Sequence, residues 1–158
     1  MSPLVARRGT IQSKTPAPAG LHQAVCVDVQ DLGVQESQWG SKHKVRLIWQ
    51  IADVDPATGR RYELARKFTL SLHERAALRT VLESWRGKKF TDTELDGFDL
   101  ERLLGVNGQV HAAHEVGADG NTYANVTLVL PPAKGAAKLQ PEQFTRLQDR
   151  GAGAGVKR

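Results

Sequence analysis

The sequence predicts one mainly β domain, made of five short strands with a helix between the third and the fourth. Apolar and polar residues alternate in five segments, which is the period of a half-buried strand. The period changes to that of a helix once, between residues 71 and 87. The 158 residues are 40% hydrophobic and 25% charged, a composition typical of a folded soluble domain and too short for two large ones.

The first three strands follow one another along the chain. Valines occupy every second position from Val25 to Val29, so we expect one apolar face in a strand there. The second strand, residues 44–51, places its apolar side chains at odd positions: Val45, Leu47, Trp49 and Ile51. Asp55-Pro-Ala-Thr-Gly59 has the composition of a turn. A third strand follows over residues 62–69, with Tyr62, Leu64 and Phe68 on its buried face.

The helical part begins after this strand. Ser71 and Glu74 have the spacing of a capping box, which predicts a helix start. Its buried stripe would be Leu78, Val81, Leu82 and Trp85, and it would end near Gly87. Thr91 and Glu94 form a second capping box, and residues 99–104 predict a short helical turn. Strands at 108–115 and 121–130, joined by a turn at 117–121, complete the domain.

The order β-β-β-α-β-β is that of an OB-fold, a five-stranded Greek-key barrel that often binds oligonucleotides. OB barrels also bind sugars and proteins, so the order alone does not give a function. We expect the barrel to span residues 21–131. Residues 1–20 show no period and predict a flexible basic arm. Residues 132–158 predict a flexible basic tail rich in Ala and Gly, with a short helix over residues 141–150 left open.

The sequence of the helical part resembles a family. The segments that carry the resemblance are Phe68-Thr-Leu-Ser-Leu-His-Glu74, Leu78-Arg79, Trp85-Arg-Gly-Lys88, Phe90-Thr91, Asp99-Leu100 and Leu103-Leu-Gly105. Together with Asp31-Leu-Gly33 and Gly40-Ser-Lys42, they are similar to phage and prophage OB-fold single-stranded DNA-binding proteins. The resemblance covers residues 22–130. It implies sequence-tolerant binding that protects unpaired strands or holds them open in phage or prophage DNA replication or recombination.

The distribution of charge locates a candidate binding surface. The net charge is +5, but residues 21–130 carry −2, so the excess lies in the two ends. Inside the domain, alternation places Lys44 and Arg46 on one face of the second strand and Lys67 on the polar face of the third. Single strands are bound by cations that follow the phosphates. The phosphate-binding candidates are Lys42, Lys44, Arg46, Arg60, Arg61, Lys67, Lys88 and Lys89.

Two aromatic residues are candidates for stacking on bases. Trp39 lies in the loop between the first two strands without apolar partners in register, and Tyr123 shares the polar face of the fifth strand with Asn125 and Thr127. Trp49 and Trp85 fall on apolar faces, so we expect them in the core. For each candidate, the alternative is an ordinary surface or loop-packing role.

Catalytic motifs are absent from the sequence, which favours a binding protein without a cofactor over an enzyme. His111 and His114 would point to opposite faces of a strand, so they do not predict a metal site. Cys26 predicts a buried, inert thiol. Two other functions stay open: an OB-like protein-interaction adaptor without nucleic-acid affinity, and a metal-dependent nuclease that would use the acids of residues 92–101.

The expected partner is single-stranded DNA, with RNA and homo-oligomers through strand edges left open. A single cysteine and the absence of a signal sequence or an apolar run of 18 residues predict a cytoplasmic protein, in the bacterial host if phage-encoded, without a membrane span.

Overall fold

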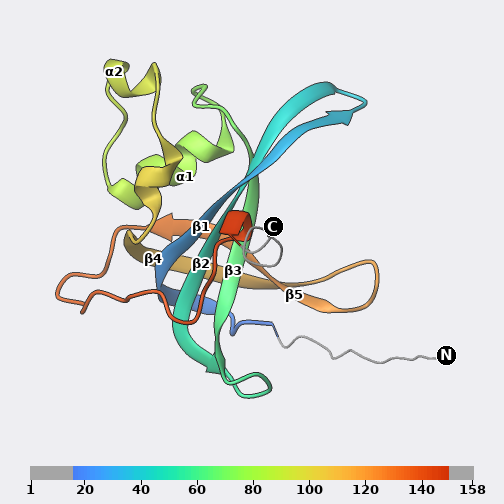
Figure 1. Cartoon of the computed structure of the whole chain (residues 1–158), viewed down its shortest axis with the longest axis vertical. Coiled ribbons are helices and arrows are strands. Elements are labelled where there is room, and N and C mark those ends of the chain that lie inside the picture. Colours follow the sequence, from blue (N-terminus) through green and yellow to red (C-terminus); the bar gives the residue numbers. More distant parts are fainter. Residues whose placement is uncertain (1–15, 150–158) are drawn as a thin grey trace.

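Five antiparallel strands form one sheet in the computed structural model, which describes residues 16–149 (Figure 1). The strands are β1 (Gly20–Ser37), β2 (Gly40–Asp55), β3 (Arg60–Thr69), β4 (Asn107–Val116) and β5 (Thr122–Leu130). Their spatial order is β3-β2-β1-β4-β5, so β3 and β5 are the edges of an open sheet. The predicted mainly β class with five strands is confirmed. Most of the expected arm, residues 1–15, and the last nine residues of the expected tail lie outside the described residues.

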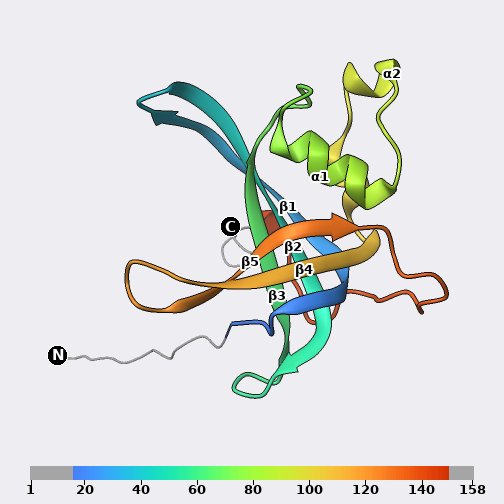
Figure 2. The ribbon, with the colours of Figure 1, turned by 180° about the vertical axis from the view of Figure 1, so that it is seen from behind.

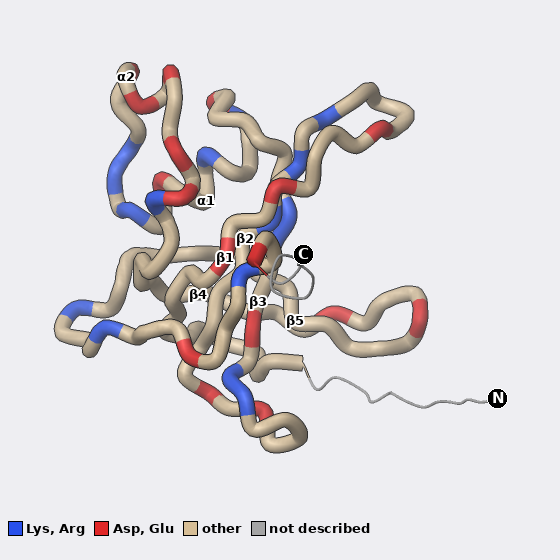
Figure 3. The backbone as a smooth tube through the Cα atoms, in the orientation of Figure 1, with Lys and Arg blue, Asp and Glu red and all other residues tan. Residues whose placement is uncertain are grey.

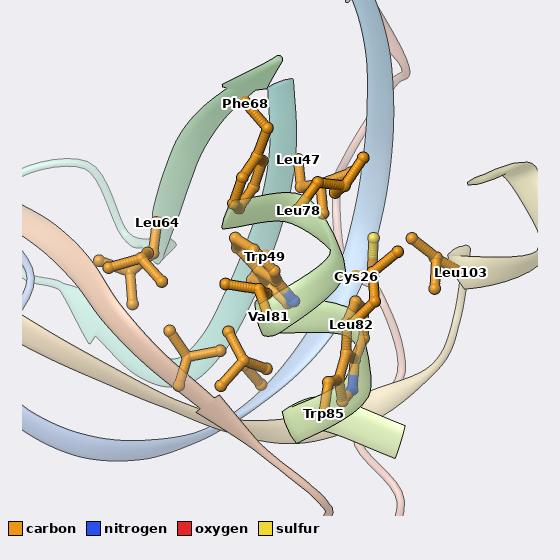
Figure 4. Packing of buried hydrophobic residues seen from close by; sticks show 14 of the residues in the cluster. Cys26, Leu47, Trp49, Leu64, Phe68, Leu78, Val81, Leu82, Trp85 and Leu103 are labelled. Carbon is orange, nitrogen blue, oxygen red and sulfur yellow. The ribbon is translucent and has the colours of Figure 1, made fainter. Parts of the chain in front are cut away.

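The sheet bends so strongly that its two ends enclose a core. β4 and β5 cross behind β2 and β3 in Figure 1 and in front of them in Figure 2. The odd-numbered side chains of β2 from Val45 to Ile51 point inward, and Trp49 is completely buried, as the alternation predicts. Helix α1 (Ala77–Arg86) adds its apolar stripe, with the Trp85 and Trp49 ring centroids 5.7 Å apart (Figure 4).

The start of α1 differs from the expectation. The helix begins at Ala77, and its N-cap Ala76 makes no side-chain cap. Ser71 Oγ instead accepts a hydrogen bond from the N–H of His73, 3.1 Å away. A hydroxyl that bonds two residues ahead stabilises a turn rather than a helix start. The helix ends as expected at Gly87, whose φ of 74° is the left-handed conformation that glycine adopts freely.

The second capping box is confirmed. Thr91 and Glu94 exchange both bonds at the start of the one-turn helix α2 (Asp92–Leu95). Hydrogen bonds from the Arg86 side chain and the Thr91 N–H hold the pKa of Glu94 at about 2. The expected helical turn is the 3-10 helix η1 (Leu100–Leu103), capped by the Asp99 carboxylate.

The middle of β1, residues 24–28, is buried on both faces, and a β-bulge interrupts its alternation. Cys26 pairs with Trp49 and Asp28 pairs with Ile48, so Val27 is an extra residue. Val25 and Val27 form a second apolar cluster with Ile48, separate from the main core that holds Cys26. Val29 is only partly buried and packs against the main core, so the three valines do not share one face as their alternation predicts.

The second cluster is covered by residues 137–147, which we call the C-terminal segment. Leu139 and Phe144 pack against the cluster, and the Gln50 side chain exchanges hydrogen bonds with the backbone of Glu142 at 2.7 and 2.9 Å. The sequence predicted a flexible tail here. Leu139 and Phe144 bury apolar surface against the sheet, whereas Leu147 at the end of the segment is exposed.

Candidate nucleic-acid interface

The outward side of β2 and β3 carries three cations in neighbouring positions. β2 and β3 are hydrogen-bonded neighbours, and Arg46 stands directly opposite Lys67 in their register. Lys44 lies two residues from Arg46 on the same face and pairs with Thr69. We call Lys44, Arg46 and Lys67 the cation row, and the side of the sheet that bears them the outer face. The expectation that these strands adjoin is confirmed.

The charge of each residue in the cation row is available to a bound anion. Lys44 Nζ donates to the Thr69 hydroxyl at 2.7 Å, and Arg46 Nη1 donates to Gln30 Oε1 at 3.4 Å. Both acceptors are neutral, so they orient the cations without cancelling their charge. Lys67 is exposed and forms no hydrogen bond or ion pair within residues 16–149.

The hairpin formed by β1 and β2 extends the outer face beyond β3 (Figure 3). Its tip carries Trp39, with 81% of the residue exposed. Ser37 fixes this turn, because its hydroxyl accepts from the Trp39 N–H and donates to the Gly40 carbonyl, both at 3.1 Å. Lys42 is exposed on the same hairpin.

One carboxylate of this hairpin is already paired. Asp31 Oδ1 lies 2.6 Å from His43 Nε2. This hydrogen bond, with a second from the Gly33 N–H, lowers the pKa of Asp31. The Asp31 carboxylate therefore interacts with His43 rather than with a ligand bound to the hairpin.

Arg60 and Arg61 lie at the opposite end of β3. Six residues separate Arg61 from Lys67, which is about 20 Å along a strand. Arg61 donates to the Gln140 carbonyl, and its Nη2 lies 3.1 Å from a Glu142 carboxylate oxygen. The C-terminal segment therefore occupies Arg61, whereas Arg60 is exposed beside the β2–β3 turn.

Lys88 and Lys89 lie away from the cation row. They follow α1, which packs on the core side of the sheet through residues such as Leu78 and Trp85. The structure does not bring them together with Arg46 and Lys67.

Tyr123 lies on the β4–β5 hairpin among acids. It pairs with Glu115, and its hydroxyl donates to the Asp119 carboxylate. That hydrogen bond raises the pKa of Tyr123 and lowers that of Asp119. In Figure 3 this hairpin shows acidic positions and no Lys or Arg. Its surroundings would repel phosphates, whereas the hairpin of Trp39 carries the exposed Lys42 as well as the exposed Glu36.

A polar network on the outer face was not anticipated from the sequence. Asp28 is 1% exposed, and Arg146 Nε of the C-terminal segment donates to its Oδ1 at 2.8 Å. Arg146 also donates to both carboxylate oxygens of Glu101, at 2.7 and 2.9 Å. The only signal in the sequence was the presence of large apolar residues in an otherwise Ala- and Gly-rich stretch.

The residues weighed for catalysis lie apart. Cys26 is buried, and this burial is the main influence on its thiol. It raises the pKa of the thiol to about 12, so the thiol stays protonated. His111 contacts the Thr127 hydroxyl at 2.7 Å, whereas His114 contacts the Ala17 carbonyl at 2.7 Å. Within residues 16–149, no three His, Cys, Asp or Glu side chains are grouped as metal ligands.

A cavity of about 760 Å³ lies between α1, η1 and residues 131–138. Trp85, Arg86, Phe98 and Val106 are among its lining residues. It is formed by different elements from those that carry the cation row.

Comparison with known proteins gives no relative: no family model matches the chain, and no curated protein is significantly similar to it. No helix within residues 16–149 has the length and apolar character that a membrane span needs.

Proposed function

We propose that this protein is an OB-fold protein that binds single-stranded DNA without sequence preference, along the β1–β2 hairpin and the cation row. The observation that carries the proposal is the direct cross-strand opposition of Arg46 and Lys67, next to Lys44, where β3 meets the β1–β2 hairpin whose tip exposes Trp39. Cations for phosphates and aromatic rings for bases are the two devices that single-strand binding uses.

The opposition of two cations needs a reason. Like charges directly opposite on neighbouring strands are destabilising, and cross-strand pairs contribute on the order of 0.2–1 kcal/mol. An anion seated between Arg46 and Lys67 relieves that repulsion. A phosphate chain supplies such anions at regular intervals, so the row suits a polyanion better than it suits the free protein.

The exposed indole of Trp39 supports the same ligand. A large aromatic residue that is 81% exposed gains little from folding. Stacking of an unpaired base on an aromatic ring is worth about 1–3 kcal/mol and tolerates any base. Duplex DNA keeps its bases stacked inside, so Trp39 favours single strands.

The strand order supports the barrel class. β1 pairs with both β2 and β4, and the helical part connects β3 to β4. We assign the protein to the OB class on this topology, with the sheet open between β3 and β5. The biological setting, phage or prophage replication or recombination in the host cytoplasm, rests on the sequence resemblance.

A titration of labelled oligo-dT at several salt concentrations tests the proposal, with fluorescence anisotropy as the signal and duplex DNA as the competitor. Three phosphates neutralised on a single strand give a log–log salt slope of about −2. Trp39→Ala and Lys44→Glu should each weaken binding at least several-fold. Lys134→Glu, an exposed lysine outside the surface, makes the same charge change as Lys44→Glu and should act much less.

The outcome separates the three functions. Preference for oligo-dT over duplex with a salt slope supports DNA binding, and oligo-U in place of oligo-dT measures the preference against RNA. Absence of binding to either overturns the proposal and favours the adaptor, for which the cavity beside α1 is the candidate surface. Cleavage of the oligonucleotide after addition of Mg²⁺ or Mn²⁺ favours the nuclease.

A further inference from the structure

A chain of hydrogen bonds connects the C-terminal segment to the cation row. Arg146 Nε donates to Asp28 Oδ1 at 2.8 Å, and Gln30 Nε2 donates to Asp28 Oδ2 at 3.1 Å. The other end of the Gln30 amide accepts from Arg46 Nη1 at 3.4 Å. Gln30 and Arg46 are direct partners in the register of β1 and β2, so the chain runs across the outer face.

Asp28 sets the orientation of the Gln30 amide. Its carboxylate only accepts hydrogen bonds, so the NH₂ end of the amide must face it. The carbonyl end then faces Arg46. Backbone N–H groups of Val29 and Leu147, both at 2.9 Å, fill the remaining acceptor positions of Asp28. The orientation of Gln30 is therefore fixed from its buried side, where only 6% of the residue is exposed.

A neutral amide between Asp28 and Arg46 has an electrical consequence. If Asp28 and Arg46 were in direct contact, they would form an ion pair. Arg46 would then release fewer counterions when it binds a phosphate. Gln30 occupies the intervening position and offers Arg46 an uncharged acceptor. Arg146 completes the arrangement, because it compensates the charge of Asp28 from the opposite side.

We propose that Gln30 and Arg146 are positioning residues for phosphate binding: Gln30 orients Arg46, and Arg146 neutralises Asp28 so that Arg46 stays available to the DNA. Neither residue needs to touch the ligand. This inference rests on the proposed DNA binding and adds to it a supporting network beneath the cation row. Although burial raises the pKa of Asp28, its hydrogen bonds from Leu147, Arg146 and Gln30 outweigh this and lower it, so the charge that Arg146 compensates is present at neutral pH.

Two substitutions at one position test the role of Gln30. Gln30→Glu keeps the shape, removes the donor to Asp28 and places a carboxylate against Arg46, so one phosphate contact is lost. The salt slope for oligo-dT then becomes shallower by about 0.7, which at 0.1 M salt corresponds to about five-fold weaker binding. Gln30→Met removes the acceptor and leaves the charge of Arg46 intact, so binding weakens less and the slope stays that of the wild type.

The matched control is Gln109→Glu, the same change on β4, where Gln109 contacts the Pro131 carbonyl. It should leave the slope unchanged. A purely structural role for Gln30 would give the Glu and Met variants equal effects on affinity and the same slope, which overturns the inference. Thermal melting of each variant verifies that it is folded at the temperature of the titration.

Arg146→Met tests the other end of the network. Removal of its charge leaves both Asp28 and Glu101 without their shared cation, and the slope should become shallower as it does in Gln30→Glu. An unchanged slope in folded Arg146→Met protein overturns the role of Arg146.

If the wild type does not bind oligo-dT, the proposed function itself fails. If it binds and the Gln30 variants share its slope, only the positioning role fails.

Discussion

Lys67 illustrates, at the scale of one residue, how a binding surface opposes stability. It faces Arg46 across the strand pair and is exposed, so its charge gives folding no evident gain. Removal of a charge from the cation row should therefore stabilise the free protein and weaken its complex with DNA.

We expect Lys67→Gln to raise the free energy of unfolding by a few tenths of a kcal/mol, up to about 1, because it removes the repulsion with Arg46. The same variant should bind oligo-dT more weakly. Urea unfolding gives the stability and the anisotropy titration gives the affinity. Lys134→Gln serves as the control and should change neither. A fall in stability on Lys67→Gln contradicts the repulsion.

Gly108 lies where β4 passes under α1, and a side chain does not fit there. A Cβ at this position would lie 2.5 Å from Trp85 Nε1 and 2.9 Å from the Leu130 carbonyl oxygen. Trp85 cannot retreat easily, because its Nε1 donates to the Asn107 carbonyl at 2.9 Å.

Gly108→Ala should therefore lower the free energy of unfolding by about 1–3 kcal/mol, the usual cost of overpacking. Gly97→Ala is the matched control, since a Cβ there has no atom within 4 Å. Urea midpoints of both variants measure the difference. Equal midpoints would mean that α1 shifts without cost.

At the scale of an element, the C-terminal segment acts as part of the sheet's outer layer. It buries Val25 and Val27 through Leu139 and Phe144, and pairs Arg146 with Asp28. Side chains that interdigitate in this way contribute to folding although the segment has almost no regular structure.

A chain that stops after Ala136 should lose about 2–4 kcal/mol of unfolding free energy, because two large apolar contacts are removed and Asp28 loses Arg146. A chain that stops after Asp149 retains all of these contacts and should unfold like the full chain. Urea denaturation compares the two. If both truncations unfold alike, the segment does not stabilise the fold.

Strict alternation determined which elements the sequence predicted well. β2 keeps an unbroken register with β3 from Lys44 to Gln50, so its inward residues and its cations in that stretch were placed correctly. β1 contains the extra residue Val27, and a period of two cannot survive a bulge. The start of α1 failed for a local reason, since Ser71 stabilises its own turn and the helix begins at Ala77.

The candidate site, like the fold, could be predicted from the sequence only in part. That Arg46 and Lys67 share a surface followed from neighbouring strands of known period. The partners of Asp28 and Arg61 did not follow, because they come from residues about 80 to 120 positions away in the chain. No local pattern reports a contact between a strand and a distant irregular segment.

At the scale of the whole molecule, acidity should weaken the fold. The lowered pKa of Asp28 means that its interactions stabilise the protein fully above its ordinary value of 3.8 and are lost as the pH falls through the lowered value. The lowered pKa of Glu94, about 2, acts in the same direction.

We therefore expect wild-type protein to melt at a higher temperature than Asp28→Asn at pH 7, and this difference to shrink as the pH falls below 3.8 and Asp28 becomes protonated. Melting curves by circular dichroism over this pH range measure it. A difference that is independent of pH would mean that the network does not depend on the carboxylate charge.

The β1–β2 hairpin continues past the end of β3, since Thr69 stands opposite Lys44 and only the Leu70 N–H reaches on to His43. Beyond that point the ribbon has two strands, and such a ribbon is marginally stable by itself. Its backbone amides, in residues 34–42, should consequently exchange their hydrogens for deuterium faster than those of residues 25–31. A ligand lying along the ribbon would slow that exchange, and the pattern of slowed amides would trace its course from Trp39 toward the body of the protein.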